Sequence, residues 1–335
     1  MRVLIVGAAG FAGRYLAREL LARGHDVVGG TRSGGSDEAP AARPGGGEWP
    51  DALPRIPLLA CDVRSPEQIA SALDATAPDA VLLLAGLASP PEANADPAAA
   101  FEVHVLGTVH VLAAMARSAP RARALIVTSS EVYGRVAARD LPIREDAPLR
   151  PEAMYAASKA GADLAAAAFG ASRGLDVVRL RPFNHTGPGQ RPTFVCPDFA
   201  SQIAAIVAGR RPPQMEVGNL DVRRDFSDVR DVVRGYALAL ERGRPGEAYN
   251  LCSGAPTAIR EILDVLCDLA GVRPEIRAAP GRTRGGEIQT LYGSFEKAAA
   301  ELGWRPELPL RTTLGDVLDR ALEEARTPAA DDRRE

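Results

Sequence analysis

The sequence has few cysteines, little net charge and no long apolar run. Its four cysteines, Cys61, Cys196, Cys252 and Cys267, lie far apart and form no Cys-x-x-Cys pair, which argues against a disulfide framework or a metal site. The formal net charge of -3 gives no reason to expect nucleic acid or an anionic membrane as a partner. No run approaches the roughly 20 apolar residues that span a bilayer, and the N-terminus shows no secretory pattern. These absences favour a protein of the reducing cytoplasm.

Short apolar runs alternate with longer amphipathic ones through the first half of the chain. Apolar residues make up 46% of the 335 residues and charged residues 25%, which is ordinary for a globular protein. The apolar runs predict buried strands at Val3–Val6, Asp26–Gly30, Ile56–Ala60, Ala80–Leu84, Ala124–Thr128 and Asp176–Arg181. The stretches between them predict helices at Phe11–Arg23, Pro66–Ala75, Pro97–Ser118 and Glu152–Arg173. This alternation predicts an α/β fold with a Rossmann-like, doubly wound parallel sheet.

The pattern changes after Pro182, where shorter segments are separated by proline and glycine. Helices are expected at Ser201–Ala208, Val229–Glu241 and Ile259–Ala270, and short strands at Met215–Val217 and Ala248–Leu251. We therefore expect a Rossmann domain over residues 1–181, a smaller C-terminal mixed α/β lobe over 182–325, and a frayed tail over 326–335.

Three glycines, Gly7, Gly10 and Gly13, lie between the first strand and the first helix. Glycine in such a turn lets the backbone approach a pyrophosphate, and the helix N-terminus supplies N–H groups and positive potential. The spacing Gly-x-x-Gly-x-x-Gly differs from the Gly-x-Gly-x-x-Gly of many dehydrogenases, but its place in a strand–turn–helix is specific. The turn, with Phe11 and Ala12, is thus predicted to bind a dinucleotide, with a purely structural tight turn as the alternative.

The end of the second strand indicates which dinucleotide is preferred. An acidic residue there would receive the ribose hydroxyls of NAD(H), whereas Arg32 and Ser33 can receive a 2′-phosphate, which favours NADP(H) over NAD(H). The alternative for Arg32 is a solvated surface side chain. Residues 33–54, rich in glycine and proline, predict a mobile loop, either without a role or as a flap beside the adenosine. Further cofactor contacts are expected after the third and fourth strands, from Asp62, Val63, Ala85 and Gly86.

A Tyr155-Ala-Ala-Ser-Lys159 motif lies on the helix predicted from Glu152. Its i, i+4 spacing places phenol and ammonium on one face, and both are also expected to contact the cofactor. Because an adjacent positive charge lowers the pKa of a phenol, Tyr155 is predicted to exchange a proton with a substrate oxygen near neutral pH. Ser129, after the fifth strand, is expected to hydrogen-bond the same oxygen. Glu131 is a candidate general base, or alternatively a carboxylate favoured by a helix start.

These motifs together resemble the extended short-chain dehydrogenase/reductase family, also described as the NAD-dependent epimerase/dehydratase family, over residues 2–318. The resemblance implies a Rossmann domain, a C-terminal substrate domain, and Ser129, Tyr155 and Lys159 as the catalytic group. It also implies nucleotide-sugar substrates and a homodimer formed through the helices Pro97–Ser118 and Glu152–Arg173.

Segments of the second half resemble the GDP-mannose branch of that family, which contains 4,6-dehydratases and 4-keto-6-deoxy-mannose reductases. They are Arg181-Pro-Phe-Asn-His-Thr-Gly-Pro-Gly-Gln190, Phe194–Phe199 and Val217–Asp231. The resemblance implies a GDP-linked nucleotide-diphosphate sugar as substrate. The implied contacts are Ser130, Asn184, Val195, Arg224, Arg284 and Glu287, with the arginines on the diphosphate, or alternatively in surface salt bridges, and Glu287 on the ribose.

Two reactions fit this branch. A dehydratase oxidises C4, removes the C5 proton with a base such as Glu131, expels the C6 hydroxyl and returns the hydride. A reductase delivers hydride to a C4 ketone while Tyr155 protonates the oxygen. Dehydratases typically carry Thr in place of Ser129 and a His-Glu-Ser-Pro stretch in place of residues 185–188, so the NADPH-dependent reductase is favoured. A UDP-sugar 4-epimerase, which usually lacks an acid at position 131, and a non-catalytic NADP-binding regulator are less favoured.

One position departs from the family pattern. His104 stands where the family usually has an Asn before the Gly107-Thr108 pair, and that Asn supports the catalytic lysine. His104 is predicted to replace it through a ring nitrogen or a water. Because histidine ordinarily titrates near neutrality, the activity is expected to be pH-sensitive.

Overall fold

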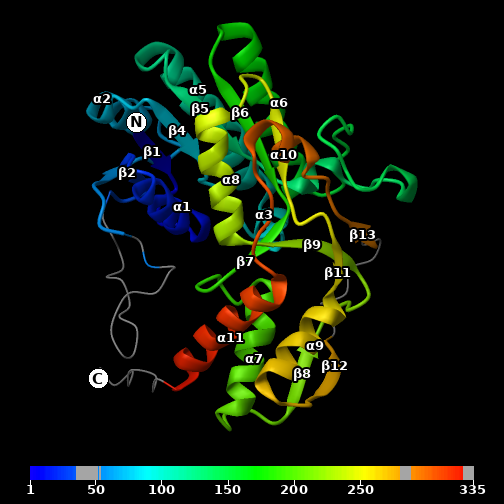
Figure 1. Cartoon of the computed structure of the whole chain (residues 1–335). Coiled ribbons are helices and arrows are strands. Elements are labelled where there is room, and N and C mark those ends of the chain that lie inside the picture. Colours follow the sequence, from blue (N-terminus) through cyan, green and yellow to red (C-terminus); the bar gives the residue numbers. More distant parts are fainter. Residues whose placement is uncertain (35–51, 53, 280–287, 327–335) are drawn as a thin grey trace.

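Seven parallel strands form the central sheet of the computed structural model, which describes residues 1–34, 52, 54–279 and 288–326 (Figure 1). The strand order is β3–β2–β1–β4–β5–β6–β10, and every neighbouring pair is parallel. The strands are β1 (Arg2–Val6), β2 (Asp26–Thr31), β3 (Leu58–Ala60), β4 (Ala80–Leu83), β5 (Arg123–Val127), β6 (Val177–Pro182) and β10 (Ala248–Leu251). The predicted parallel Rossmann-like sheet is therefore confirmed.

Helices cover both faces of this sheet. Successive side chains of each strand point to opposite faces, and since both sets are apolar, both faces have to be buried. Val3 and Ile5 pack with α1 (Phe11–Ala22), α8 (Val229–Arg242) and α10 (Glu296–Leu302). Leu4 and Val6 pack with α2 (Pro66–Thr76), α5 (Gly107–Ser118) and α6 (Met154–Arg173). The strands are thus buried on both faces, which explains why they read as continuous apolar runs.

Between the neighbouring strands β1 and β4, the direction in which successive strands are added to the sheet changes. The chain leaves β1 toward β2 and β3, then crosses back through α2 to place β4 on the other side of β1. The segments after these two strands touch, since the Ala85 N–H donates to the Val6 carbonyl at 2.9 Å. Ligands of open α/β sheets bind in the crevice at such a switch point, so this edge is where a site is expected.

The predicted helix Pro97–Ser118 is not regular. It consists of α4 (Pro97–Phe101), a π-helical turn η1 (Glu102–Leu106) and α5, and is preceded by a short helix α3 (Pro90–Ala95) that the sequence did not predict. By length and composition this stretch is apolar enough to cross a membrane, contrary to the sequence-based expectation, and 44% of its window is buried within the protein. Its inner side, including Leu112, packs in the core with α2.

The smaller part of the molecule contains the remaining elements of the described chain (Figure 1). Three helices, α7 (Val195–Val207), α9 (Ile259–Ala270) and α11 (Leu310–Arg326), share one core cluster. Beside them lie β7 (Asn184–Thr186), β8 (Gln214–Val217), β9 (Arg223–Asp228), β11 (Pro256–Ala258), β12 (Glu275–Ala278) and β13 (Thr290–Leu291). Short 3-10 turns, η2 (Ser130–Tyr133) and η3 (Ala138–Asp140), follow β5.

Several elements differ from the sequence-based expectation. The predicted strand at Ala248–Leu251 and the helix at Val229–Glu241 belong to the large sheet and its cover, which a division at residue 181 did not anticipate. Helix α7 begins at Val195 and not at Ser201, because Pro197 is tolerated in a first helical turn. Most of the predicted 33–54 loop, and the tail after Arg326, lie outside the described residues.

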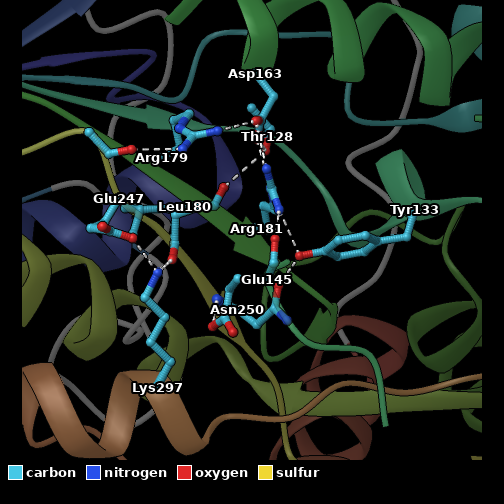
Figure 2. A network of polar contacts seen from close by, with 12 residues as sticks. Thr128, Tyr133, Glu145, Asp163, Arg179, Leu180, Arg181, Glu247, Asn250 and Lys297 are labelled. Atoms are coloured by element: carbon cyan, nitrogen blue, oxygen red, sulfur yellow. Dashed lines mark hydrogen bonds and ion pairs between the residues drawn. The ribbon is translucent and has the colours of Figure 1, made fainter. Parts of the chain in front are cut away.

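A buried polar network fixes the catalytic helix to the sheet (Figure 2). The Asp163 carboxylate of α6 accepts from Arg181 at 2.8 Å on each oxygen, from Arg179 at 2.9 Å and from the Thr128 hydroxyl at 3.1 Å. Arg181 also donates to the Tyr133 hydroxyl at 2.9 Å. Burial opposes the charge on Asp163, but the bonds and charges of Arg181 and Arg179 outweigh it and hold its pKa below the usual value.

We predict that Asp163→Asn lowers the free energy of unfolding by about 3–5 kcal/mol, because it leaves Arg181 buried without its counter-charge. Since the pKa of Asp163 is lower in the folded protein, its stabilisation is complete above the unfolded value of about 3.9 and is lost as the pH falls through the folded value. Urea unfolding at pH 7 and at progressively lower pH measures both effects. The exposed Glu275, paired with Arg277 at 3.0 Å, supplies the control Glu275→Gln, which should not change stability measurably. Equal effects of the two variants would contradict the prediction.

Candidate active site

The glycine-rich turn joins β1 to α1 at the switch point. Gly7 has a φ of 97°, its N–H donates to the Gly30 carbonyl at 2.9 Å, and Gly10 donates back to Gly7 at 3.1 Å. A Cβ built on Gly7 would lie 2.7 Å from the Ala85 nitrogen, and one on Gly13 would lie 2.4 Å from the Gly7 carbonyl oxygen. The residue before α1 is Gly10, which has no side chain to cap the helix, so among the described residues the first N–H groups of α1 can face an anion. This cradle fits a dinucleotide pyrophosphate.

The predicted adenosine contacts follow β2 and β3 at the same edge. Arg32 is exposed directly after β2. Asp62, after β3, is paired with Arg64 at 2.6 Å, and its pKa is lowered mainly by the hydrogen bond from Arg64, with a smaller contribution from the charge of Arg32. Val63 is buried beside it. Arg32 and Asp62 therefore lie near one another, where the second ribose of a dinucleotide is expected.

Gly86 brings the other end of the predicted cofactor path to the catalytic helix. A Cβ on Gly86 would lie 2.9 Å from Nε2 of His104 and 3.3 Å from Nζ of Lys159. The loop after β4 thus runs directly over these two side chains. A nicotinamide that follows Ala85 and Gly86 would lie beside Lys159.

Ser129, Glu131 and Tyr155 come together where β5 ends and α6 begins. Ser129 precedes η2 and accepts the Glu131 N–H at 3.2 Å. Burial raises the pKa of Tyr155 well above its usual range, the Glu131 carboxylate raises it further, and a hydrogen bond with Ser129 lowers it in part. Tyr155 and Lys159 are 8% and 7% exposed, so both are held away from water.

The expectation that Lys159 lowers the pKa of Tyr155 was wrong for the structure as described. The Lys159 ammonium donates to the Val127 carbonyl at 3.4 Å, and burial lowers its own pKa to about 8. The i, i+4 spacing places both side chains on one face, but removal from water dominates the titration of each. A protonated phenol and a weakly basic amine therefore lie next to the cofactor loop.

The expectation that His104 makes the activity pH-sensitive was also wrong. His104 is 2% exposed, and burial together with the charge of Lys159 lowers its pKa to about 2. Its Nε2 accepts the Leu87 N–H at 3.0 Å and its Nδ1 lies 2.8 Å from the Ser158 hydroxyl. The ring therefore stays neutral across the working pH range, and its hydrogen bonds reach Leu87 and Ser158 rather than Lys159.

The predicted substrate contacts lie on several elements. Ser130 is buried in η2, Asn184 belongs to β7, Val195 begins α7 and Arg224 lies on β9. Strands β7 and β9 pair in parallel, with Asn184 opposite Phe226, so two of these segments meet in one sheet. Arg284 and Glu287 lie outside the described residues.

Three residues near the site were not predicted from the sequence as contacts of the catalytic group. The Asn94 side chain from α3 accepts the Tyr155 N–H at 2.9 Å, and Ser158 donates to the Tyr155 carbonyl at 2.8 Å. Leu87 donates its backbone N–H to His104, and its side chain packs against the cluster of Ala93, Ala100 and Tyr155. Ser158 lies within the Tyr155–Lys159 motif and could have been suspected, whereas contacts between α3 and α6 leave no signal in local sequence.

Comparison with known proteins identifies the class. A family model described as GDP-mannose 4,6 dehydratase matches residues 4–317, and the chain belongs to this family within the extended short-chain dehydrogenase/reductases. It is a nicotinamide-dependent enzyme of that class.

Two relatives and one solved structure show which members of this family the chain is similar to. A GDP-6-deoxy-D-mannose reductase of Pseudomonas aeruginosa is 40% identical over 241 residues, covering 72% of this chain and 79% of the relative. A GDP-mannose 4,6-dehydratase of Sinorhizobium fredii is 28% identical and covers 92% of this chain and 93% of its own. The solved structure of RMD from Pseudomonas aeruginosa complexed with NADPH aligns with a TM-score of 0.82 at 33% identity, covering 96% of this chain and 99% of that one.

We predict that Gly7→Ala weakens NADPH binding by about tenfold or more, since the new Cβ must push the turn away from Ala85 and disturb the N–H groups that would face the pyrophosphate. Titration of the nucleotide fluorescence measures the affinity. Gly24 is the matched control, because it has a φ of +79° but nothing within 4 Å of an added Cβ. Gly24→Ala should lower only stability, and an equal loss of NADPH affinity in both variants would show that backbone strain alone is responsible.

Proposed function

We propose that the protein is an NADPH-dependent reductase that acts at C4 of a nucleotide-diphosphate sugar, namely GDP-4-keto-6-deoxy-D-mannose. The observation that carries the proposal is the grouping of Ser129 and Tyr155 beside Gly86 and Lys159, at the edge where the glycine cradle lies. The choice of substrate is supported by the 40% identity to a GDP-6-deoxy-D-mannose reductase and by the Ser129 and Asn184–Gly189 sequence pattern.

When bound, the cofactor supplies the hydride for C4 of the keto sugar. Tyr155 is protonated at neutral pH because burial raises its pKa, so its phenol holds the proton that the C4 oxygen must receive. The Ser129 hydroxyl, hydrogen-bonded to the same phenol, can orient that oxygen. Lys159, with a pKa of about 8, is largely protonated at neutral pH and lies beside Gly86, where the nicotinamide is expected. Solvent then returns the proton to Tyr155. The product carries one hydride on C4 and one proton on the oxygen.

The second candidate is a GDP-mannose 4,6-dehydratase. Glu131 is the observation in its favour, because this carboxylate is close enough to Tyr155 to raise the phenol's pKa and so lies near the reacting carbons. In that reaction Glu131 would take the C5 proton, and the cofactor would be regenerated. In the reductase, Glu131 needs no chemical step.

We also propose that NADP(H) is preferred and that two copies associate. Arg32, exposed at the end of β2, supports the cofactor preference, as does the NADPH complex of the similar RMD structure. Large apolar side chains at Phe101, Leu106 and Leu164 are 37%, 49% and 59% exposed on the adjoining segments α4, η1 and α6, which supports a shared interface there.

Incubation of the protein with NADPH and GDP-4-keto-6-deoxy-D-mannose should oxidise one cofactor for each sugar reduced, whereas GDP-mannose alone should remain unchanged. Loss of water from GDP-mannose without net cofactor use would instead indicate the dehydratase.

We predict that Tyr155→Phe lowers turnover by about 10²–10⁴-fold while NADPH still binds, because only the proton donor is removed. Tyr249→Phe, which removes a hydroxyl bonded to Glu301 at 2.7 Å, should leave turnover unchanged. Normal turnover in Tyr155→Phe would refute the mechanism.

We predict that Arg32→Ala raises the KM for NADPH by about tenfold or more, since a charge-assisted contact to the 2′-phosphate is lost, and leaves the KM for NADH unchanged. Initial rates with both cofactors measure the change in preference. The control is Arg2→Ala, which should leave both KM values unchanged. Arg2 is an exposed arginine at the start of β1, away from the edge that carries Arg32, and it pairs with Asp26 at 2.8 Å. A parallel rise of both KM values in Arg32→Ala would show that Arg32 does not read the 2′-phosphate.

A further inference from the structure

The peptide groups on both sides of Tyr155 are held by side chains. Its N–H donates to Oδ1 of Asn94 at 2.9 Å, although the residue at the start of α6 provides no cap of its own. Its carbonyl accepts from the Ser158 hydroxyl at 2.8 Å. The backbone that carries the phenol is therefore tied to α3 at one end and to Ser158 at the other.

A single direction of hydrogen bonding runs from the cofactor loop to this carbonyl. The Leu87 N–H can only donate, so Nε2 of His104 must accept and the ring proton must lie on Nδ1. Nδ1–H then donates to the Ser158 oxygen at 2.8 Å, and the Ser158 proton goes to the Tyr155 carbonyl. His104 and Ser158 each donate one of these hydrogen bonds and accept another, and their side chains are buried, with exposed fractions of 2% and 0%.

The local backbone is shaped to admit the imidazole. His104 lies in the π-helical turn η1, whose wider spacing interrupts an otherwise regular helix, and such turns are frequent at functional sites. The ring packs so closely on the loop that a Cβ at Gly86 would lie 2.9 Å from Nε2. The rings of His104 and Tyr155 also contact each other in a T-shaped arrangement, with ring centroids 5.8 Å apart and an interplanar angle of 83°.

We propose that His104 is a positioning residue that couples the loop Ala85–Leu87 to Tyr155 through the relay Leu87–His104–Ser158. This inference rests on the proposed function, which places the nicotinamide beside Gly86 and the proton on Tyr155. The relay fixes the distance between the nicotinamide, which donates the hydride, and the Tyr155 phenol, which donates the proton. A displacement of the loop Ala85–Leu87 therefore displaces Tyr155, and the reverse also holds. The His104 ring is neutral and is held by the Leu87 donor on one side and the Ser158 acceptor on the other, so it couples the positions of these groups without carrying a charge.

Two variants separate the two contacts, because Asn places its amide nitrogen where Nδ1 lies and Gln places its amide oxygen where Nε2 lies. We expect His104→Asn to keep the Ser158 contact and release Leu87, so that NADPH binds about fivefold more weakly while kcat is little changed. His104→Gln should keep Leu87 and release Ser158, so that NADPH affinity is retained while kcat falls about tenfold. His104→Leu should show both losses.

Ser158→Ala tests the same relay from its other end. In combination with His104→Gln it should lower kcat no further than Ser158→Ala alone, because Ser158→Ala already removes the contact that His104→Gln cuts. Val111→Ala, which removes buried volume from α5 but none of the hydrogen bonds of the relay, should lower Tm without changing NADPH affinity or kcat. The affinity measurement needs no sugar substrate, so it remains informative if the wild-type enzyme fails to reduce the proposed sugar.

The relay is overturned if His104→Asn and His104→Gln both resemble the wild type, or if both resemble His104→Leu, since either result removes the distinction between the two contacts. Additive losses in the Ser158→Ala double variant also overturn it. In contrast, failure of the wild type to consume NADPH with GDP-4-keto-6-deoxy-D-mannose would refute the proposed function and leave the NADPH affinities of the variants as the test of the coupling.

Discussion

The Asp163 carboxylate is the constraint on which the active-site geometry depends. It lies one helical turn beyond Lys159 on α6, and its two oxygens accept from Arg179, Arg181 and Thr128. Thr128 directly precedes Ser129 in the chain. A single buried anion therefore fixes the helix with the phenol and the amine against the strand end with the serine. Such a charge is tolerated in the core only because its hydrogen bonds are complete.

The rest of the site extends from this fixed pair toward the cofactor. Arg181 continues the network to the Tyr133 hydroxyl. Because Tyr133 lies two residues beyond Glu131, this hydrogen bond also fixes the turn that carries Ser129 and Glu131. On the other side of α6, His104 and Asn94 connect Tyr155 to the segment that follows β4. The glycine turn closes the edge, because Gly7 allows that segment to approach the end of β1. The sheet edge, the catalytic helix and the cofactor loop are thus positioned by side chains from several separate segments, among them β6, α3 and η1.

Sequence periodicity predicted the strands and most helices of the first half, because each of these is buried on a continuous or amphipathic face. It missed the short helix α3 and the π-helical turn η1. The second half was harder. Strands such as β11 and β13 are short, and the burial of β9 does not alternate along the strand. Strand β10 could not be assigned to the large sheet, since strand order depends on pairing between distant segments. At the site, the motif placed Tyr155 and Lys159 on one face correctly. It could not predict their titration, nor the partners of His104, because desolvation and contacts with residues 17 and 54 positions away arise only on folding.

We propose that this site delivers a hydride to C4 of a keto sugar while Tyr155 supplies the proton. A single turnover with NADPH deuterated at the transferred position, followed by NMR of the product, tests it most directly. We expect one deuterium on C4 of the product for each cofactor oxidised. A product without deuterium at C4, or conversion of GDP-mannose with the label returned to another carbon and no net oxidation of cofactor, would contradict it.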